Sequence, residues 1–403
     1  MTTTPNEDRI GLALSGGGSR AIAYHLGCLR ALKEANLLKS VEVISTVSGG
    51  SVVGAMYAYR ECSFEQFEKD VRDLLKEGLL WKIIGRTLHP KNLARSIATS
   101  ATAGTAAKAT QGISLIAKAA QSACEALDLT GGSRASRSEW SAALTPPFRR
   151  WWSRSHAFEE VLSNWLFGDK GLRAPRRHDV DIVINATELK TGTAFRYGSK
   201  STSAWRYGQV VDECSVAEAV SASAAYPLFL PAFHRRYTFG EQEKSEEVVL
   251  TDGGVYDNLG STCLEPDRNP KYTDHVYGHN SIITCHAGMG QWPEKSRSYG
   301  WASRVSRSML TTFRKNEDGQ KGQAVKWGTD ETSPFKNSIL ASLGQKDEKL
   351  RRDLGESVPK DLVPRGSVIH YPTDFNAMPP EDLNRIVLRG EQVTELLIDE
   401  YWN

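Results

Sequence analysis

The sequence has few cysteines, and none of them are closely spaced. Six cysteines are spread over 403 residues without a C-x-x-C pair. Scattered thiols of this kind are typical of a reducing compartment, whereas secreted disulfide frameworks and structural zinc sites use clustered cysteines. The pattern therefore argues against both a disulfide framework and a metal site.

An excess of charge of one sign and long apolar runs are also lacking. Lys and Arg total 50 against 48 for Asp and Glu, and the resulting net charge of +2 argues against a dedicated nucleic-acid binder. No apolar run reaches the roughly 18 residues that a membrane-spanning helix needs. The N-terminal segment MTTTPNEDRIGLALSGGG has no basic and apolar regions like those of a signal peptide, so we expect a cytoplasmic protein.

Residues 9–60 contain the clearest pattern, a strand, a Gly-rich turn and a helix, which occurs twice. RIGLALS leads through GGGSR into a helix-period run, and VEVISTVS leads into GGSVVGAMYAYREC. Repeated units of this kind are typical of an α/β fold with a parallel sheet and right-handed crossovers.

Ser48 follows the second of these strands and has Gly50 two positions later. A nucleophile elbow needs small residues on both sides of its serine, because strand and helix pack closely around a strained turn. Thr46 stands at the −2 position, where glycine is expected. Ser51 is the poorer candidate, because Val53 at its +2 position would crowd the turn. We therefore predict Ser48 as the nucleophile.

The other Gly-rich turn, SGGGSR at residues 15–20, joins the first strand to the first helix. Its glycines Gly16, Gly17 and Gly18 allow backbone N–H groups to face one point, and the helix N-terminus adds positive potential. Either a phosphate or a developing oxyanion would fit there. The turn is not a Walker loop, but with Ala21 it satisfies the form G-x-G-x-x-G/A, so a nucleotide site stays open.

A third Gly-rich segment, TDGGVYDNLG, places Asp252 at the end of a predicted strand, before Gly253 and Gly254. A carboxylate held there, beside another strand's serine, could accept the serine's proton directly. Asp-Gly is also a common turn dipeptide, so a plain turn is the alternative.

In this order, the three segments resemble the patatin-like phospholipase family. That family has a D-G-G-G-x-R/K-G loop, a G-x-S-x-G elbow and a D-G-A/G segment, and this sequence has SGGGSRA at 15–21, TVSGG at 46–50 and DGG at 252–254. NATELKTGTAFRYG and AVSASAAYPLFLPAF extend the likeness to about 9–60 and 155–290. The resemblance implies a three-layer α/β/α hydrolase with a mostly parallel central sheet.

The resemblance also implies a Ser–Asp dyad. Ser48 would attack an ester carbonyl and Asp252 would be the base, without a histidine, metal or organic cofactor. The N–H groups of Gly16, Gly17, Gly18 and Gly49 would form the oxyanion hole, with Arg20, Thr46, Gly50, Gly253 and Gly254 in supporting positions. Three residues depart from the family's pattern, namely Ser15 for Asp, Ala21 for Gly and Thr46 for Gly. We expect Thr46 to be the departure that affects the elbow.

The implied substrate is a phospholipid or lysophospholipid, which the enzyme would reach by transient contact with the inner membrane surface. The run RRWWSR, with Arg149, Arg150, Trp151 and Trp152, could anchor at such a surface. Buried tryptophans beside solvated arginines are the alternative. We predict no nucleic-acid partner, and nothing in the sequence sets an oligomeric state.

Histidine offers other chemistry at two places. His286 follows the predicted acid and could belong to a His-based triad, although a structural histidine is the default. His275 and His279 have i, i+4 spacing, but Gly278 indicates a loop, and zinc needs three or more ligands. We therefore predict no metal site.

The predicted organisation is an N-terminal tail (1–8), a catalytic domain (9–290) and a helical extension (291–403) packed on the same domain. Within the catalytic domain, residues 92–150 form a predicted helical insertion and a candidate lid, rich in Ala, Ser, Thr and Gly over 92–138. LVPRGS at 362–367 matches a thrombin-cleavage linker and carries no functional inference. Two alternatives stay open, a non-catalytic lipid-binding or regulatory module and a nucleotide-binding domain using Glu34 or Glu42 at the ribose.

Overall fold

The computed structural model describes residues 8–88, 154–227, 229–240, 243–288 and 300–402. The chain divides into two compact units, Met1–Ile83 with Ser155–Asn403, and Ile84–Arg154. The predicted insertion at 92–150 lies outside the described residues, as do Arg149, Arg150, Trp151 and Trp152. These predictions therefore stay predictions, and the fold below is that of the first unit.

The centre of this unit is a parallel sheet in the order β10-β9-β1-β2-β3. Its strands are β1 (Ile10–Leu14), β2 (Val41–Val47), β3 (Asp181–Glu188), β9 (Ser281–His286) and β10 (Asn337–Ser342). β1 and β9 are buried along their whole length, as expected for strands covered on both faces.

Antiparallel strands continue the sheet beyond β3. On one side follow β4 (Thr193–Gly198), β5 (Ser203–Ala204) and β6 (Gly208–Gln209). On the other side β8 (Lys244–Asp252) pairs with the last residues of β3 and with β7 (Phe233–Phe239). The sheet is therefore mixed, with a parallel centre.

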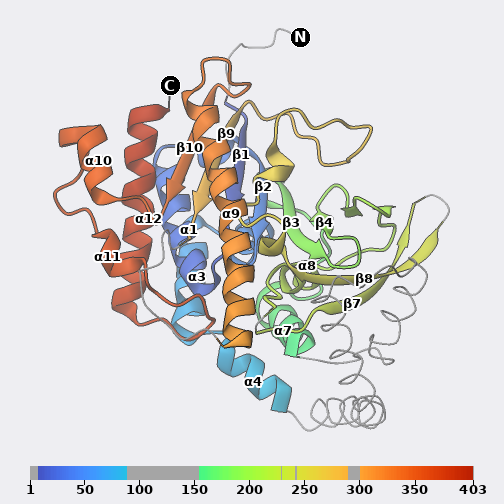
Figure 1. The fold of residues 1–403 in the computed structure, drawn as a ribbon. Helices are drawn as coiled ribbons and strands as arrows, with labels where there is room; N and C mark the ends of the chain where they lie inside the picture. Colours follow the sequence, from blue (N-terminus) through green and yellow to red (C-terminus); the bar gives the residue numbers. More distant parts are fainter. Residues whose placement is uncertain (1–7, 89–153, 228, 241–242, 289–299, 403) are drawn as a thin grey trace, which may run out of the picture. The chain divides into compact units, whose positions relative to one another are not determined.

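Helices cover both faces of the parallel centre (Figure 1). From β1 the chain crosses through α1 (Gly18–Glu34) to β2, whereas from β9 it crosses through α9 (Trp301–Thr329) to β10 in the opposite direction. Right-handed crossovers in opposite directions place α1 and α9 on opposite faces. α12 (Pro380–Tyr401) packs along α1 and closes the chain. This architecture confirms the predicted three-layer α/β/α fold with a mostly parallel sheet.

A hydrophobic cluster fixes α9 on its face of the sheet. Ala324 and Trp327 of α9 pack over Ala13, Val43 and Ile282, which come from three neighbouring strands. Because side chains alternate along a strand, these residues all point to one side of the sheet. The remaining helices are α2 (Gly49–Tyr59), α3 (Phe64–Glu77), α4 (Leu80–Leu88), α7 (Arg154–Leu162), α8 (Val216–Ser223), α10 (Asp347–Leu354) and α11 (Arg365–Val368). Short 3-10 segments cover Leu38–Ser40, Arg177–Asp179, Gly253–Val255, Thr262–Leu264 and Gly355–Ser357, and Ser163–Phe167 forms a π turn.

Two local details concern α8 and the LVPRGS segment. α8 ends at Ser223, and beyond its end the Ala225 carbonyl accepts the Asp252 N–H at 3.0 Å. The LVPRGS segment is an integral part of the fold, since Leu362 and Val363 are buried.

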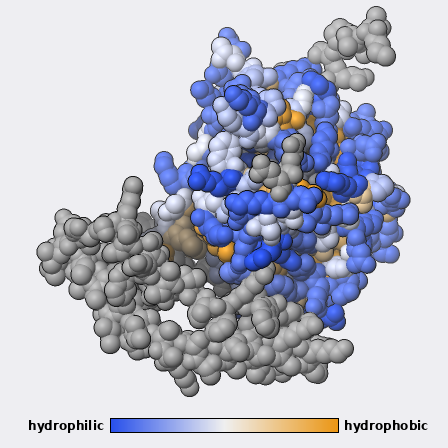
Figure 2. Space-filling view, turned by 90° about the vertical axis from the view of Figure 1, so that its right-hand side faces the viewer, coloured by the Kyte–Doolittle hydropathy of each residue, from blue (hydrophilic) through white to orange (hydrophobic). Residues whose placement is uncertain are grey.

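The face shown in Figure 2 is mostly hydrophilic, with apolar residues in separate small patches. Among the helices that the structure describes, none is long and apolar enough to cross a bilayer.

Candidate active site

The site lies where the chain direction across the sheet reverses. β1 leads to β2 on one side, and β9 leads to β10 on the other, so the reversal falls between β1 and β9. Ligands of open α/β sheets bind at such a point, beside the carboxyl ends of the strands. Here those ends lead into the glycine loop (residues 15–18) after β1 and Ser48 after β2.

Ser48 occupies a strained turn between β2 and α2. Its φ is 52° and its ψ is −118°, a backbone conformation that costs a non-glycine residue about 1–3 kcal/mol. A hydrogen bond stabilises the turn, because the Ser48 N–H donates to Ser223 Oγ at 3.0 Å. Ser51 Oγ lies 2.8 Å from the same Ser223 oxygen and donates to Thr46 Oγ1 at 3.0 Å. Ser51 is thus part of the support beneath the turn.

The register of β3 brings Asp252 to this turn. Val47, the last residue of β2, pairs with Asn185, and the next residue of β3, Ala186, pairs with Asp252. β8 therefore pairs with β3 on the same side as β2, starting at the residue after the last one that β2 pairs with. As a result, Asp252 and Ser48 meet although they lie far apart in the sequence.

The Asp252 carboxyl group is buried and held in place by its own turn. Its Oδ1 accepts the Gly254 N–H at 2.7 Å, and its carbonyl oxygen accepts the Thr187 hydroxyl at 2.9 Å. Burial raises the pKa of Asp252 to about 6, against the lowering effects of the Ser48 hydroxyl and the Gly254 N–H. Oδ2 has no hydrogen-bond partner among the described residues, and the Ser48 hydroxyl is near enough to lower the pKa of the group. This oxygen is therefore available to accept a proton.

The glycine loop lies against the serine turn. A Cβ at Gly16 would lie 3.3 Å from Ser48 Cβ, and one at Gly49 would overlap the Gly18 carbonyl oxygen. Gly17 and Gly18 have φ values of 144° and 58°, which favour glycine. The Gly16 N–H donates to the Asn258 carbonyl at 3.0 Å. Within the described part of the chain, the N–H groups of Gly17, Gly18 and Gly49 have no hydrogen-bond acceptor, which leaves these three for an oxyanion.

The backbone of Thr373 and Asp374 packs against the start of α1. The Ser19 N–H donates to the Asp374 carbonyl at 3.0 Å. A Cβ at Gly18 would overlap the Thr373 carbonyl group. The Ser19 N–H is therefore not available to an anion bound at this helix N-terminus.

The histidines that offered alternatives have other partners. His286 Nδ1 lies 2.9 Å from Ser342 Oγ, and its Nε2 contacts Glu317. Both ring nitrogens are thereby engaged away from Ser48. His275 contacts the Ser203 hydroxyl at 3.1 Å and His279 contacts the Leu264 carbonyl at 3.0 Å, so this pair forms no common site.

The comparisons with known proteins agree with the fold. The family description "Patatin-like phospholipase" matches residues 12–261. The chain belongs to the patatin-like phospholipase family. At the level of the family it is a lipid hydrolase. No curated protein matches the sequence closely enough to serve as a named relative.

One of the similar solved structures has a TM-score above 0.5 and supports the fold. The human GIVD cytosolic phospholipase A2 is similar at a TM-score of 0.51 and 12% identity, with 97% of this chain and 59% of that chain covered. This chain thus spans somewhat less than two thirds of that phospholipase. VipD from Legionella pneumophila gives a TM-score of 0.37 at 16% identity, covering 98% of this chain and 67% of VipD. ExoU, a type III effector of Pseudomonas aeruginosa, gives 0.33 at 14% identity, covering 99% of this chain and 54% of ExoU.

The first departure from the patatin-like pattern, Ser15, is an anchor of the glycine loop. Its Oγ accepts the Ala287 N–H at 2.9 Å, and its N–H donates to the Cys285 carbonyl at 3.1 Å. Ala21 is fully buried on α1, and its N–H donates to the Gly17 carbonyl at 3.2 Å.

The remaining departure, Thr46, is accommodated by a glycine on the facing helix. A Cβ at Gly54 would lie 2.5 Å from Thr46 Cγ2, so the absence of a side chain there gives the threonine methyl group its room. Thr46 Oγ1 donates to the Val183 carbonyl at 3.2 Å. The elbow thus has its small residue, Gly54, in α2, whereas the family's pattern has a glycine two positions before the serine.

Other supporting residues hold the backbone. Arg20 is buried and donates to the Ala287 carbonyl at 3.0 Å and to the Tyr371 carbonyl at 3.0 Å, which braces the loop against the C-terminal segment. Burial lowers the pKa of Arg20 to about 10, partly offset by Glu317. Cβ atoms at Gly50 and Gly253 would overlap the carbonyl groups of Leu14 and Asn185.

Two supporting residues were not predicted from the sequence. Ser223 lies in AVSASAAYPLFLPAF, a segment that carries the family likeness, but nothing in that segment marked this serine as a support of the elbow. Asn258 lies in the DGGVYDN segment, six residues after the predicted base, and its Oδ1 is 2.5 Å from a Cβ position at Gly16 and 2.7 Å from one at Gly254. Its place between the glycine loop and the Asp252 turn follows only from the fold.

Proposed function

We propose that this chain is a serine acyl hydrolase that cleaves ester bonds of phospholipids or lysophospholipids through Ser48 and Asp252. One observation carries the proposal. Ser48 has a positive φ at a strand-to-helix turn, and it lies beside the buried carboxyl group of Asp252, whose Oδ2 has no hydrogen-bond partner among the described residues. A serine hydroxyl is a weak nucleophile and needs both a base and a fixed geometry.

In the first step Ser48 Oγ attacks the ester carbonyl carbon while its proton passes to Asp252 Oδ2. The carbonyl oxygen becomes an oxyanion, and the N–H groups of Gly17, Gly18 and Gly49 stabilise it. Removing one such donor typically costs about 2.7–4 kcal/mol of transition-state stabilisation. The tetrahedral intermediate collapses, the alkoxide of the lipid leaves, and Asp252 returns the proton to it.

In the second step water hydrolyses the acyl-enzyme. Asp252 takes a proton from the water, whose oxygen attacks the acyl carbon, and the second intermediate expels Ser48 Oγ. The proton returns to the serine and a fatty acid leaves. Asp252 is the only acid–base group in both steps of this scheme. A general base works best when its pKa lies near the operating pH, and a pKa of about 6 for Asp252 meets that condition near neutral pH.

The lipid substrate implies contact with a membrane surface. We propose that this contact is transient and peripheral at the inner membrane surface of a cytoplasmic protein, with Arg149, Arg150, Trp151 and Trp152 as the candidate anchor. The alternative is a non-catalytic lipid-binding or regulatory module. The free oxygen of Asp252 and the strained Ser48 favour an enzyme, because a binding module has no need of either.

A fluorophosphonate probe tests the nucleophile. We expect the wild-type chain to be labelled, Ser48→Ala and Asp252→Asn to lose labelling, and Ser51→Ala to retain it at a lower rate. Release of fatty acid from phosphatidylcholine and lysophosphatidylcholine vesicles by the same variants tests the substrate class. Vesicle binding without labelling or hydrolysis would favour the binding module, and labelling that persists in Ser48→Ala would exclude Ser48 as the nucleophile.

A further inference from the structure

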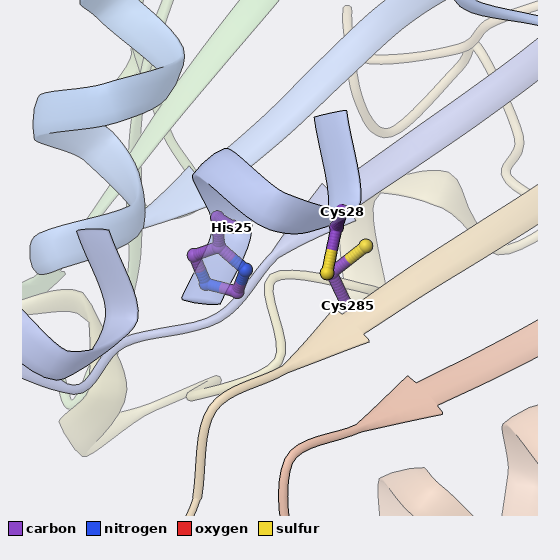
Figure 3. A group of neighbouring side chains, drawn as sticks. All are labelled: His25, Cys28 and Cys285. Carbon is purple, nitrogen blue, oxygen red and sulfur yellow. The ribbon is translucent and has the colours of Figure 1, made fainter. Parts of the chain in front are cut away.

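Three buried side chains with metal-binding atoms meet behind the glycine loop (Figure 3). His25 and Cys28 lie one helical turn apart on α1, and Cys285 lies in β9. All three have 0% exposure, and one ligand atom from each lies within 4.8 Å of the others. Among the residues that the structure describes, no other group of three His, Cys, Asp or Glu side chains comes this close.

The hydrogen bond of His25 fixes which nitrogen is available. Nε2 lies 2.9 Å from the Ser15 carbonyl oxygen. A carbonyl oxygen only accepts, so Nε2 carries the proton and Nδ1 carries the lone pair. Nδ1 is buried and has no hydrogen-bond partner within the described ranges, and Figure 3 shows the ring facing the two sulfur atoms. A histidine that donates its other N–H to a carbonyl group is the usual arrangement of a metal ligand.

The two thiols are free and lie beside each other. The hydroxyl of Tyr24 is buried next to Cys28. It is placed to donate to the Cys28 sulfur once a metal ion has replaced the thiol proton.

We propose that His25 Nδ1, Cys28 Sγ and Cys285 Sγ bind one Cu(I) ion. Soft thiolate ligands select Cu(I) over hard cations, and three donors are enough for it. A structural zinc site takes four protein ligands, and no fourth His, Cys or carboxylate joins the group in the described part of the chain. Binding releases the two thiol protons, so the metal replaces protons without any redox step.

The position of this site links it to the glycine loop. His25 holds the Ser15 carbonyl oxygen, and the Cys285 carbonyl accepts the Ser15 N–H. Both residues therefore contact the residue directly before Gly16. Copper binding would fix the relative position of α1 and β9 at this anchor and stabilise the folded chain.

The test uses the full chain, purified and reduced under anaerobic conditions, in a Cys62→Ser, Cys124→Ser background that removes two thiols outside the group. Cu(I) is titrated in competition with bicinchoninate, and bound copper is read from the thiolate-to-copper ultraviolet absorption. We expect one Cu(I) per chain and a higher unfolding temperature. His25→Gln, Cys28→Ala and Cys285→Ala should each weaken binding at least tenfold, whereas Cys214→Ala, which removes another buried thiol, should not change it.

X-ray absorption of the loaded chain is the second measurement and should give two sulfur neighbours and one nitrogen neighbour for each copper. Complete transfer of copper to bicinchoninate while the chain stays folded would overturn the proposal. Equal binding by Cys28→Ala would do the same. Preferential binding of Zn(II) at these residues would overturn the assignment of Cu(I), and none of these readouts depends on ester hydrolysis.

Discussion

Gly54→Ala tests whether the elbow depends on the space beside Thr46. An added Cβ would lie 2.5 Å from Thr46 Cγ2, whereas the contacts with Leu14 Cδ1 at 3.4 Å and Ile44 Cγ2 at 3.7 Å are ordinary. Carbon atoms in contact are about 3.5–4.0 Å apart, so one group must move by roughly an ångström. Overpacking of this kind costs about 1–3 kcal/mol of folding free energy.

Helix propensity predicts the opposite sign. Gly54 lies inside α2, where alanine is more favourable than glycine by about 1 kcal/mol. The two effects are separated by Thr46→Ser, which removes the methyl group and keeps the hydroxyl that bonds Val183 and Ser51. We expect Gly54→Ala to be neutral to destabilising by about 2 kcal/mol when Thr46 is present, and stabilising by up to about 1 kcal/mol in the Thr46→Ser background.

The assay is urea unfolding of the four chains of this cycle, read together with the rate of fluorophosphonate labelling at Ser48. Gly322→Ala is the control, because Gly322 lies inside α9 with nothing within 4 Å of an added Cβ, so only propensity acts there. A coupling energy of about 1–3 kcal/mol between positions 46 and 54 is expected for residues in contact. If Gly54→Ala stabilises both backgrounds as Gly322→Ala does, the reasoning about steric compensation is wrong.

The remaining predictions concern the base and the support of the turn. Burial raises the pKa of Asp252 to about 6, and this base acts only when it is ionised. We therefore expect kcat/KM to fall by about tenfold between neutral pH and pH 5. A flat pH–rate profile over this range would contradict the assignment of Asp252 as the base. Ser223→Ala removes the acceptor of the Ser48 N–H and should cost about 1–3 kcal/mol in urea unfolding and slow labelling, whereas unchanged values would show that the bond is dispensable. Arg20→Lys should also lower stability by about 1–3 kcal/mol, since a single ammonium group cannot reach both carbonyl oxygens that Arg20 binds, and an equal unfolding midpoint would argue against the bracing role.

Local patterns in the sequence predicted the first two strands, the Gly-rich turns that follow them and the position of Ser48 in the second turn. A turn that packs a strand closely against a helix needs small residues in fixed positions, so it leaves a mark a few residues long. The helices that follow these turns, α1 and α2, are predicted in the same way from periodicity.

The meeting of Ser48 and Asp252 required a different kind of information. It depends on β8 pairing with the last three residues of β3, on the side where β2 ends, and no local pattern encodes such a register. The family resemblance implied that Ser48 and Asp252 act together as nucleophile and base, but it did not explain how the fold brings them together. Likewise Ser223, Asp374 and Cys285 act through contacts with residues that are distant in the sequence.

The strain at Ser48 explains why so many polar groups lie beneath the turn. A left-handed serine persists only when its surroundings fix it, and its conformation costs about 1–3 kcal/mol. The bond from its N–H to Ser223, itself held by Ser51, is of the size needed to offset that cost, at about 0.5–1.5 kcal/mol for each hydrogen bond. Ser51 bonds Thr46 in turn, so the departure from glycine at −2 adds a hydrogen bond to the support that a glycine could not supply. Thr46 and Gly54 therefore compensate for each other: Gly54 in the helix leaves room for the Thr46 methyl group, and Thr46 in the strand supplies the stabilising hydroxyl.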